Sequence, residues 1–256
     1  MTARRADALL ALAGVSQRFG DVHVLADVSF SVTHGEFVAI VGPSGCGKST
    51  LLNICSGWLR PSAGRVDRPN RVRMVFQQDG LFPWMTVAEN IDLGLRHVAG
   101  AAERRRRAEG LADLVGIRGF ERHYPHQLSG GMRQRVELAR ALGGGTDLLL
   151  MDEPFSSLDY LSRLRMRLEL ARLLREEPRT VVLVTHDIEE AAQLADRVLV
   201  LADRPAHIRN EVRLAASRPR DPTHPEVVRA VHRILTDLGL ESDLEPVAAV
   251  PREDLR

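Results

Sequence analysis

A glycine-rich stretch followed by lysine and serine offers the clearest chemistry in the sequence. Gly42, Gly47, Lys48 and Ser49 fit the spacing G-x-x-x-x-G-K-[ST]. An apolar run at 38–41 precedes the stretch and a helical pattern follows it, which is the context that this spacing requires. Glycines let backbone N–H groups surround an anion, and a helix start directs its positive end at the same point. The stretch therefore predicts a nucleotide-phosphate site, with Lys48 at the outer phosphates and the Ser49 hydroxyl on Mg²⁺.

Two adjacent carboxylates, Asp152 and Glu153, follow the apolar run 148–151. A carboxylate at the end of a buried strand, beside a phosphate loop, can hold Mg²⁺ through its water shell. The second carboxylate can polarise an attacking water. Acidic residues after a strand also commonly cap a helix. Pro154 and the phosphate loop favour the catalytic interpretation.

Residues 128–134 read Leu-Ser-Gly-Gly-Met-Arg-Gln and open a helical pattern. Ser129 can serve as the N-cap, which would explain the serine alone. A cap does not require two glycines, whereas Gly130 and Gly131 at a helix start expose N–H groups to an anion. Two γ-phosphate sites far apart in one chain suggest that the second serves the nucleotide of another copy.

Short apolar runs alternate with helical patterns along the rest of the chain. The runs indicate strands, and the alternation predicts an α/β protein with a parallel sheet covered on both faces. Between about 87 and 142 the spacing is helical, which predicts a helical insertion, and residues 60–64 are expected to form a loop. The strands are expected at 9–19, 22–32, 38–41, 73–76, 148–151, 181–184 and 198–201.

Three helices are expected after the insertion. The first covers 159–175 and the second 188–194. The third lies after about residue 215 and has apolar residues at helical spacing between 227 and 238, which predicts an amphipathic helix docked on the domain or on a partner. We therefore divide the chain into a main domain, 1–214, and a C-terminal extension, 215–256. The residues expected on one side of the first helix are Leu161, Leu164, Leu168 and Leu173.

Composition limits the possible partners and compartments. The 256 residues carry a net charge of +1 and only 4% aromatic residues, which argues against a nucleic-acid partner. Cys46 and Cys55 are the only cysteines. Cys46 lies in the phosphate loop and Cys55 in the helix expected after it, which argues against a structural disulfide or a metal pair. No apolar run approaches the roughly 20 residues that span a bilayer. The apolar run 8–15 is interpreted as a first strand rather than a leader, so we expect a cytosolic protein.

With these motifs, residues 9–213 resemble the ATP-binding subunits of ABC transporters, and the segment 128–134 is the most specific point of the resemblance. The resemblance implies a P-loop NTPase with a RecA-like core, an antiparallel β-subdomain and an inserted helical subdomain. It also implies hydrolysis of ATP with Mg²⁺ in a head-to-tail homodimer that traps two ATP molecules.

The resemblance assigns roles residue by residue. Phe19 is at the position of an adenine-stacking aromatic, although tyrosine is commoner there, and Ser157-Leu158-Asp159 is at the loop that crosses the dimer interface. The implied catalytic residues are Glu153 as general base, His186 as the γ-phosphate switch, Gln77 and Lys48, and the implied Mg²⁺ ligands are Ser49, Gln77 and Asp152. The implied ATP contacts are Phe19, Gly42, Pro43, Ser44, Gly45, Cys46, Gly47, Lys48, Ser49, Thr50, Ser129, Gly130, Gly131 and Asp159.

The segment 80–85, Gly-Leu-Phe-Pro-Trp-Met, lies between Gln77 and the helical insertion. Its aromatics either pack in the core or form a groove for a short helix of a membrane partner, which is the family's use of this region. Segments 76–84, 132–136 and 152–155 resemble importer ATPases of the nitrate, sulfonate and taurine group. The implied partners are a permease and, indirectly, a periplasmic or lipid-anchored solute-binding protein, with the chain peripheral on the cytoplasmic face of the inner membrane.

Other functions fit the residues less well. An ABC ATPase of DNA repair or translation, without a membrane partner, usually carries a long coiled coil or two ATPase units. A P-loop kinase or GTPase would leave 129–134 and His186 without a role, and an inactive binding module would not need Lys48, Asp152 and Glu153. Gly143-Gly144-Gly145 departs from the family's usual proline-containing lead, and the sequence does not explain it.

Overall fold

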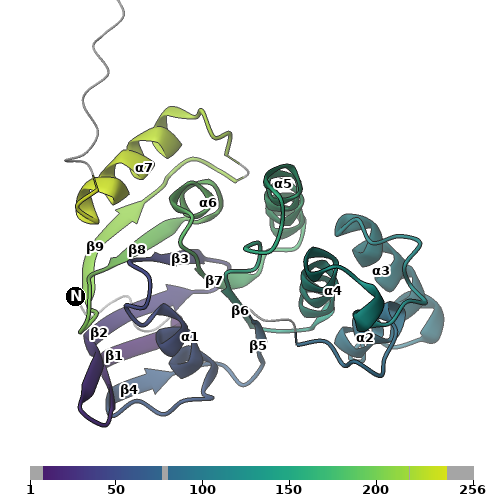
Figure 1. Ribbon diagram of the computed structural model, residues 1–256, viewed down its shortest axis with the longest axis horizontal. Coiled ribbons are helices and arrows are strands. Elements are labelled where there is room, and N and C mark those ends of the chain that lie inside the picture. The colour runs from purple at the N-terminus through teal and green to yellow at the C-terminus, as the bar shows by residue number, and fades with distance from the viewer. Residues whose placement is uncertain (1–7, 77–79, 219, 241–256) are drawn as a thin grey trace, which may run out of the picture.

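A six-stranded sheet in the order β5-β6-β7-β3-β8-β9 runs through the computed structural model, which describes residues 8–76, 80–218 and 220–240 (Figure 1). The first five of these strands are parallel, as predicted, but β9 pairs antiparallel with β8 at the edge of the sheet. Its half-exposed sequence gave no apolar run from which a strand could be predicted. The strands are β3 (Phe37–Val41), β5 (Val72–Val75), β6 (Leu148–Asp152), β7 (Thr180–Val184), β8 (Arg197–Leu201) and β9 (Ile208–Arg213).

A smaller antiparallel sheet, β2-β1-β4, packs beside it. It consists of β1 (Ala8–Phe19), β2 (Val22–Thr33) and β4 (Ala63–Asp67). The loop expected at 60–64 is therefore corrected, because its last two residues, Ala63 and Gly64, begin β4. A Cβ at Gly64 would lie 2.4 Å from the carbonyl oxygen of Gly14, so only glycine permits this close pairing with β1.

Alternate residues of the central strands enter two different cores. Val38 and Ile40 of β3 pack with α1 (Lys48–Ser56) and the small sheet, whereas Phe37, Ala39 and Val41 pack on the opposite side. Because side chains alternate along a strand, each buried strand supplies both faces. The parallel sheet is thus covered on both sides, which fixes the carboxyl ends of β3, β6 and β7 at one edge.

Two further helices pack on the face opposite α1: α5 (Tyr160–Glu176) and α6 (Ile188–Leu194). The helix expected at 159–175 forms, but its expected face is wrong. Leu161 is exposed and Leu164, Leu168 and Leu173 are only partly buried. The alternation of leucine with arginine in this helix obscured the buried side, which includes Met166, Arg167, Leu170, Ala171 and Leu174.

The helical segment after β5 comprises α2 (Val87–Gly94), α3 (Ala101–Leu114), the short 3₁₀ helix η2 (Pro125–Gln127) and α4 (Gly130–Gly143). These helices lie to one side of the sheet, away from β1, β2 and β4 (Figure 1). Helix α2 begins at a capping box between Thr86 and Glu89. The α2 backbone approaches α4 so closely that a Cβ at Gly94 would lie 2.1 Å from the carbonyl oxygen of Arg140.

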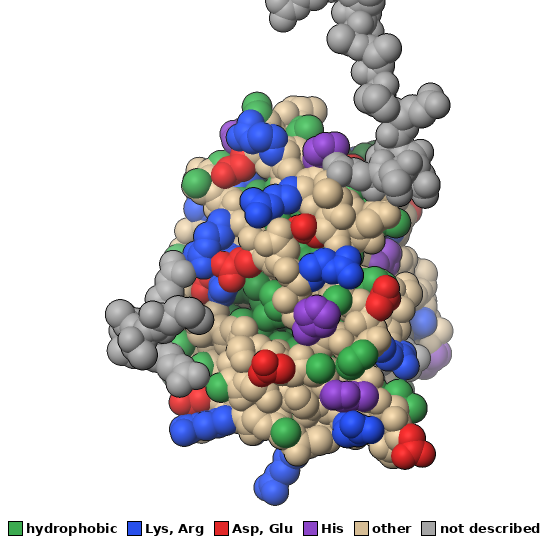
Figure 2. Space-filling model, turned by 90° about the vertical axis from the view of Figure 1, so that its left-hand side faces the viewer, with side chains coloured by type: hydrophobic (Ala, Val, Ile, Leu, Met, Phe, Trp, Pro, Cys, Tyr) green, Lys and Arg blue, Asp and Glu red, His purple; other side chains and the backbone are tan. Residues whose placement is uncertain are grey.

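The C-terminal helix α7 (Pro225–Asp237) packs against α6 and β9 through Val227, Ala230 and Ile234. The buried side chain of Arg220 fixes the segment that leads into α7, because its Nη1 donates to the carbonyl oxygen of Ala195 at 2.7 Å. On the face that Figure 2 shows, basic and acidic side chains are interspersed. In the described ranges, none of the helices has the length and apolarity to cross a membrane, and Cys46 and Cys55 are free and buried.

Candidate nucleotide-binding and hydrolytic site

The phosphate loop connects β3 to α1 and is shaped by two glycines with positive φ. Gly45 has φ +74° and Gly47 has φ +121°, conformations that other residues rarely adopt. A Cβ at Gly47 would also lie 2.7 Å from Cγ1 of Val24. Gly47 occupies the N-cap of α1 and offers no side chain to its N–H groups. The start of α1 can therefore present those groups to an anion.

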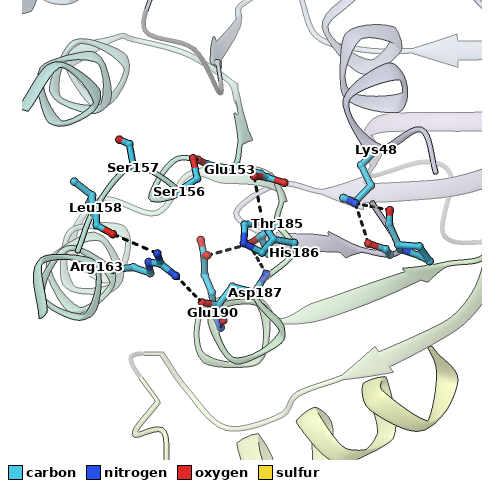
Figure 3. A network of polar contacts seen from close by, with 12 residues as sticks. Lys48, Glu153, Ser156, Ser157, Leu158, Arg163, Thr185, His186, Asp187 and Glu190 are labelled. Carbon is cyan, nitrogen blue, oxygen red and sulfur yellow. Dashed lines mark hydrogen bonds and ion pairs between the residues drawn. The ribbon is translucent and has the colours of Figure 1, made fainter. Parts of the chain in front are cut away.

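The Lys48 ammonium folds back onto this loop (Figure 3). Nζ donates to the carbonyl oxygens of Gly42 and Pro43, both at 2.8 Å, and the side chain is only 7% exposed. Both acceptors are neutral carbonyl groups, so they do not neutralise the positive charge of Lys48, which stays beside the phosphate loop.

A pocket of about 570 Å³ opens above the loop. It brings together the adenine candidate Phe19, the loop and the acid Glu153, which come from β1, the β3–α1 connection and the end of β6. Among the described residues, its lining does not include His186, Asp159 or the tip of α4. The lining residues are Phe19, Val22, Val24, Ser44, Gly45, Gly47, Lys48, Ser49, Thr50, Glu153 and Arg204. Of these, Arg204 was not foreseen from the sequence, because no motif marks the β8–β9 connection.

Asp152 ends β6 beside Ser49, and its carboxyl is almost fully buried. Burial raises its pKa and the charge of Glu153 adds to this, while a hydrogen bond with Ser49 and the charge of Lys48 oppose the shift. Within the described part of the chain, Oδ1 is buried without a hydrogen-bond partner. A buried acceptor without a hydrogen-bond partner lowers the free energy of unfolding unless a ligand or ion binds it. A hard divalent cation with its water shell fits this oxygen and the neighbouring Ser49 hydroxyl.

Glu153 and His186 meet at the ends of β6 and β7 (Figure 3). Oε2 of Glu153 lies 3.1 Å from Nδ1 of His186. Glu153 has φ +47°, a left-handed conformation that is unusual for a residue with a side chain. Its N–H donates to the carbonyl oxygen of Val184 at 2.9 Å, which helps to hold this backbone. The strained turn directs the carboxylate into the pocket, away from the sheet.

Gln134 of α4 connects Glu153 to the predicted interface loop. Its Nε2 donates to the carbonyl oxygen of Glu153 at 3.1 Å, and its Oε1 accepts from the backbone N–H of Ser157 at 3.2 Å and from the Ser157 hydroxyl. The side chain is buried, so these bonds are shielded from water. The sequence showed Gln134 within the motif at 128–134, but gave no reason to place it beside Glu153.

The tip of α4 is open to solvent at the point that the sequence predicted. Ser129 caps the helix by accepting from the N–H of Met132 at 3.3 Å. Gly130 is exposed, and a Cβ on Gly131 would lie 3.3 Å from the carbonyl oxygen of Ser157. The second glycine thus permits the interface loop to pass close to the helix. Asp159 lies just beyond this loop and caps α5 by accepting from the N–H of Ser162.

A charged network lies behind His186 (Figure 3). Arg163 donates to the carbonyl oxygen of Leu158 in the interface loop at 3.3 Å and lies 3.4 Å from Asp187. Asp187 also pairs with the buried Arg167, which lies 3.6 Å from Glu190. Burial raises the pKa of Glu190 to about 7, although the charge of Arg167 opposes the shift. The interface loop and the turn carrying His186 are thereby fastened to one another.

Gln77 lies outside the described residues. The residues before and after the gap are both held by the buried carboxylate of Glu137 on α4. Oε1 accepts from the N–H of Phe76 at 3.2 Å, and Oε2 accepts from the N–H of Gly80 at 2.8 Å. Arg140 adds a bond to the carbonyl oxygen of Gly80 at 2.9 Å. The segment after β5 is thus anchored on the helix whose tip carries Gly130.

Comparisons with known proteins identify the class to which this fold and site belong. A family model described as ABC transporter matches residues 25–156. The chain belongs to the ABC transporter family and is an ATPase of the ABC type, which uses ATP with Mg²⁺.

Individual relatives agree with this assignment. An aliphatic sulfonates import ATP-binding protein of Rhodococcus jostii is 48% identical over 217 residues, covering 82% of this chain and 85% of the relative. A taurine import ATP-binding protein of Pelagibacter ubique is 46% identical over 202 residues, covering 75% of this chain and 76% of the relative. A dimeric ATP-binding cassette in a post-hydrolysis state bound to ADP and Pi is similar in structure, with a TM-score of 0.71, 33% identity, and coverage of 81% of this chain and 99% of that chain.

Proposed function

We propose that this chain is the subunit of an importer that hydrolyses ATP to energise uptake of a small anionic solute, such as an aliphatic sulfonate, taurine or nitrate. The observation that carries the proposal is the meeting of Lys48, Ser49 and Glu153 in one pocket. Similarity to import ATP-binding proteins for sulfonates and taurine supports the class of solute.

In the proposed reaction, water attacks the γ-phosphorus of ATP in line with the leaving group. Lys48 and the N–H groups of the phosphate loop hold the phosphates, while Phe19 stacks on adenine. Glu153 accepts the proton of the attacking water, and His186 fixes Glu153 and contacts the γ-phosphate. Gln77 orients the water, and Ser49 and Asp152, with Gln77, would hold the metal ion. When bound, Mg²⁺ neutralises charge that develops on the phosphate oxygens.

The second half of the site comes from another copy of this chain. Ser129, Gly130 and Gly131 lie on the surface, where they can face the nucleotide of a partner. Asp159 and the loop before it line the same interface, and two ATP molecules are held between two subunits. The similarity to dimeric ATP-binding cassettes supports this arrangement. ATP drives a cycle because it binds the closed dimer more tightly than the open one.

The Glu153→Gln variant tests the catalytic assignment. Glutamine is the same shape but cannot accept the proton, so we expect hydrolysis to fall by about 10²- to 10⁴-fold while ATP affinity is kept. The variant should then accumulate as an ATP-stabilised dimer in size-exclusion chromatography. A variant that stays monomeric with saturating ATP would contradict the shared site.

The exposed aromatic segment at 81–84 is the proposed contact with the permease. Leu81 is buried, but Trp84 is 69% exposed and its ring lies 5.4 Å from that of Phe82. An exposed tryptophan packed on a partly buried phenylalanine suits a short helix of a partner. The chain would then lie on the cytoplasmic face of the cell membrane, and the solute would be delivered by a binding protein on the opposite side.

Recovery of the chain from detergent-solubilised membranes of its own cells tests this partnership. We expect an integral-membrane permease to copurify with the wild-type chain and much less with Trp84→Ala, whose basal hydrolysis should be unchanged. Val228→Ala on α7, another exposed apolar residue, is the control. In the purified complex, binding protein loaded with a sulfonate should stimulate hydrolysis. Absence of any copurifying permease would leave an ATPase without a membrane partner.

A further inference from the structure

The β8–β9 connection forms a wall of the nucleotide pocket that no sequence motif marks. It is fixed against β2, because the N–H of Ala206 donates to the carbonyl oxygen of Val24 and the N–H of Ala26 donates to that of Ala206, both at 2.9 Å. Val24 itself lines the pocket. These bonds therefore hold the β8–β9 connection against the pocket wall at Val24. They also keep Arg204, which belongs to this connection, close to the phosphate loop.

The guanidinium of Arg204 reaches the outer edge of that loop. Its Nε donates to the carbonyl oxygen of Gly45, and a Cβ at Gly45 would lie 3.2 Å from its Nη2. In the described part of the chain, this is the hydrogen bond that Arg204 makes, and it uses one of the five N–H donors of the group. The terminal nitrogens remain at a pocket whose other cation is Lys48.

We propose that Arg204 is a second cation of the nucleotide pocket and binds the polyphosphate of the nucleotide through its terminal nitrogens. The inference rests on the proposed function, since it needs nucleotide in this pocket. Three observations carry it: the side chain lines the pocket, it is bonded to the phosphate loop, and the connection that carries it is paired with β2 at Ala206. A guanidinium suits this task because its planar fork matches phosphate oxygens and stays charged at all working pH values.

The chain offers a matched control on the same hairpin. Arg209 on β9 is also exposed, but its Nη1 donates to the carbonyl oxygen of Asp237 and it does not line the pocket. Arg204→Gln removes the charge and retains an N–H donor, whereas Arg204→Lys retains the charge. If Arg204 only braced Gly45, both variants would be affected alike, and the unliganded protein would melt at a lower temperature.

The test measures the affinity of the full-length chain for ATP, ADP and adenosine, by competition with a fluorescent ATP analogue. For Arg204→Gln we expect the Kd values for ATP and ADP to rise about tenfold, as loss of a charged hydrogen bond predicts, while that for adenosine stays unchanged. Arg204→Lys keeps the charge but not the planar fork, so it should recover part of the affinity. Arg209→Gln should match the wild type, and melting without nucleotide should not shift.

Three outcomes would overturn the inference. Unchanged ATP affinity in Arg204→Gln would show that the guanidinium does not contact the nucleotide. An equal loss for adenosine would place the contact on the base or ribose, and an equal loss in the lysine variant would mark a bracing role. If the wild-type chain bound no ATP, the proposed function itself would fail, which this measurement distinguishes from failure at Arg204 alone.

Discussion

Nδ1 of His186 lies 3.1 Å from Oε2 of Glu153, so the residue at the end of β7 holds the acid at the end of β6. Loss of this contact should remove one restraint on the carboxylate that we propose as the general base. We expect His186→Ala to lower the rate at saturating ATP by about 10- to 100-fold, as for a hydrogen bond to a charged group. His34→Ala, at an exposed turn, should leave the rate unchanged. Equal rates for the two variants would refute the coupling.

Gln134 should be required for both stability and rate, because it joins Glu153 and Ser157 across two elements. Gln134→Leu has a similar volume but leaves the part-buried carbonyl oxygen of Glu153 and the N–H of Ser157 without this partner. We expect unfolding in urea to require about 1–3 kcal/mol less free energy, together with a lower hydrolysis rate. Glu109→Leu, at an exposed position in α3, should change little in either measurement. A fully active Gln134→Leu would mean that the strained Glu153 turn does not depend on α4.

Glu190 should make stability depend on pH. Burial raises its pKa to about 7 in the folded chain from the ordinary 4.5 of a glutamate, so the folded state binds its proton more tightly than the unfolded state does. Stability from this group is present below about pH 4.5 and is lost as the pH rises through about 7.

Urea unfolding at several pH values checks this dependence against Glu190→Gln, which cannot titrate. Relative to the variant, the wild-type chain should lose about 2–3 kcal/mol between about pH 5 and about pH 8. Arg163, Arg167 and Asp187 face the same carboxyl and are retained in both proteins, so their titration cancels. Parallel pH curves for the two proteins would show that Glu190 is ionised throughout.

Two glycines in the helical segment should respond in opposite directions to alanine. At Gly94 the new Cβ would lie 2.1 Å from the carbonyl oxygen of Arg140, so α2 and α4 must separate and we expect destabilisation of about 2 kcal/mol or more. At Gly110, within α3, nothing lies within 4 Å of the new Cβ, and alanine should stabilise the chain by about 0.5–1 kcal/mol. Thermal unfolding of both variants measures the contrast, which the reverse order would contradict.

The buried runs of the sequence were sufficient to predict the central strands, because a strand covered on both faces must be apolar throughout. The strands β4 and β9 lack that signal. Ala63–Asp67 and Ile208–Arg213 are stabilised by pairing with β1 and β8, which no local pattern reveals. The apolar face of α5 was misassigned for a related reason, since the buried Arg167 belongs to an ion-pair network that forms only after folding.

At the site, the sequence itself predicted the phosphate loop, Asp152 and Glu153 at strand ends, whereas His186 was predicted only through the family resemblance. The structure places His186 beside Glu153. Side chains that act through tertiary contacts were not predictable. Gln134 and Glu137 resemble ordinary helix residues until α4 is placed beside β5 and β6. A Cβ at Gly144 or Gly145 would meet the side chain of Arg73 at 2.8 Å or of His97 at 2.7 Å, so these side chains would have to shift to admit a larger residue where the chain leaves α4.

The hydrogen bonds that Glu137 accepts from the N–H groups of Phe76 and Gly80 have a mechanical consequence. The anchor sits midway along α4, a rod of 14 residues and about 21 Å. A permease helix bound at Phe82, as proposed, would push on α4 rather than on the sheet, since Arg140 of α4 also contacts the Phe82 ring. The movement would then shift Gly130 at the other end of α4, so the position of the permease and the proposed contact with a neighbour's γ-phosphate would change together.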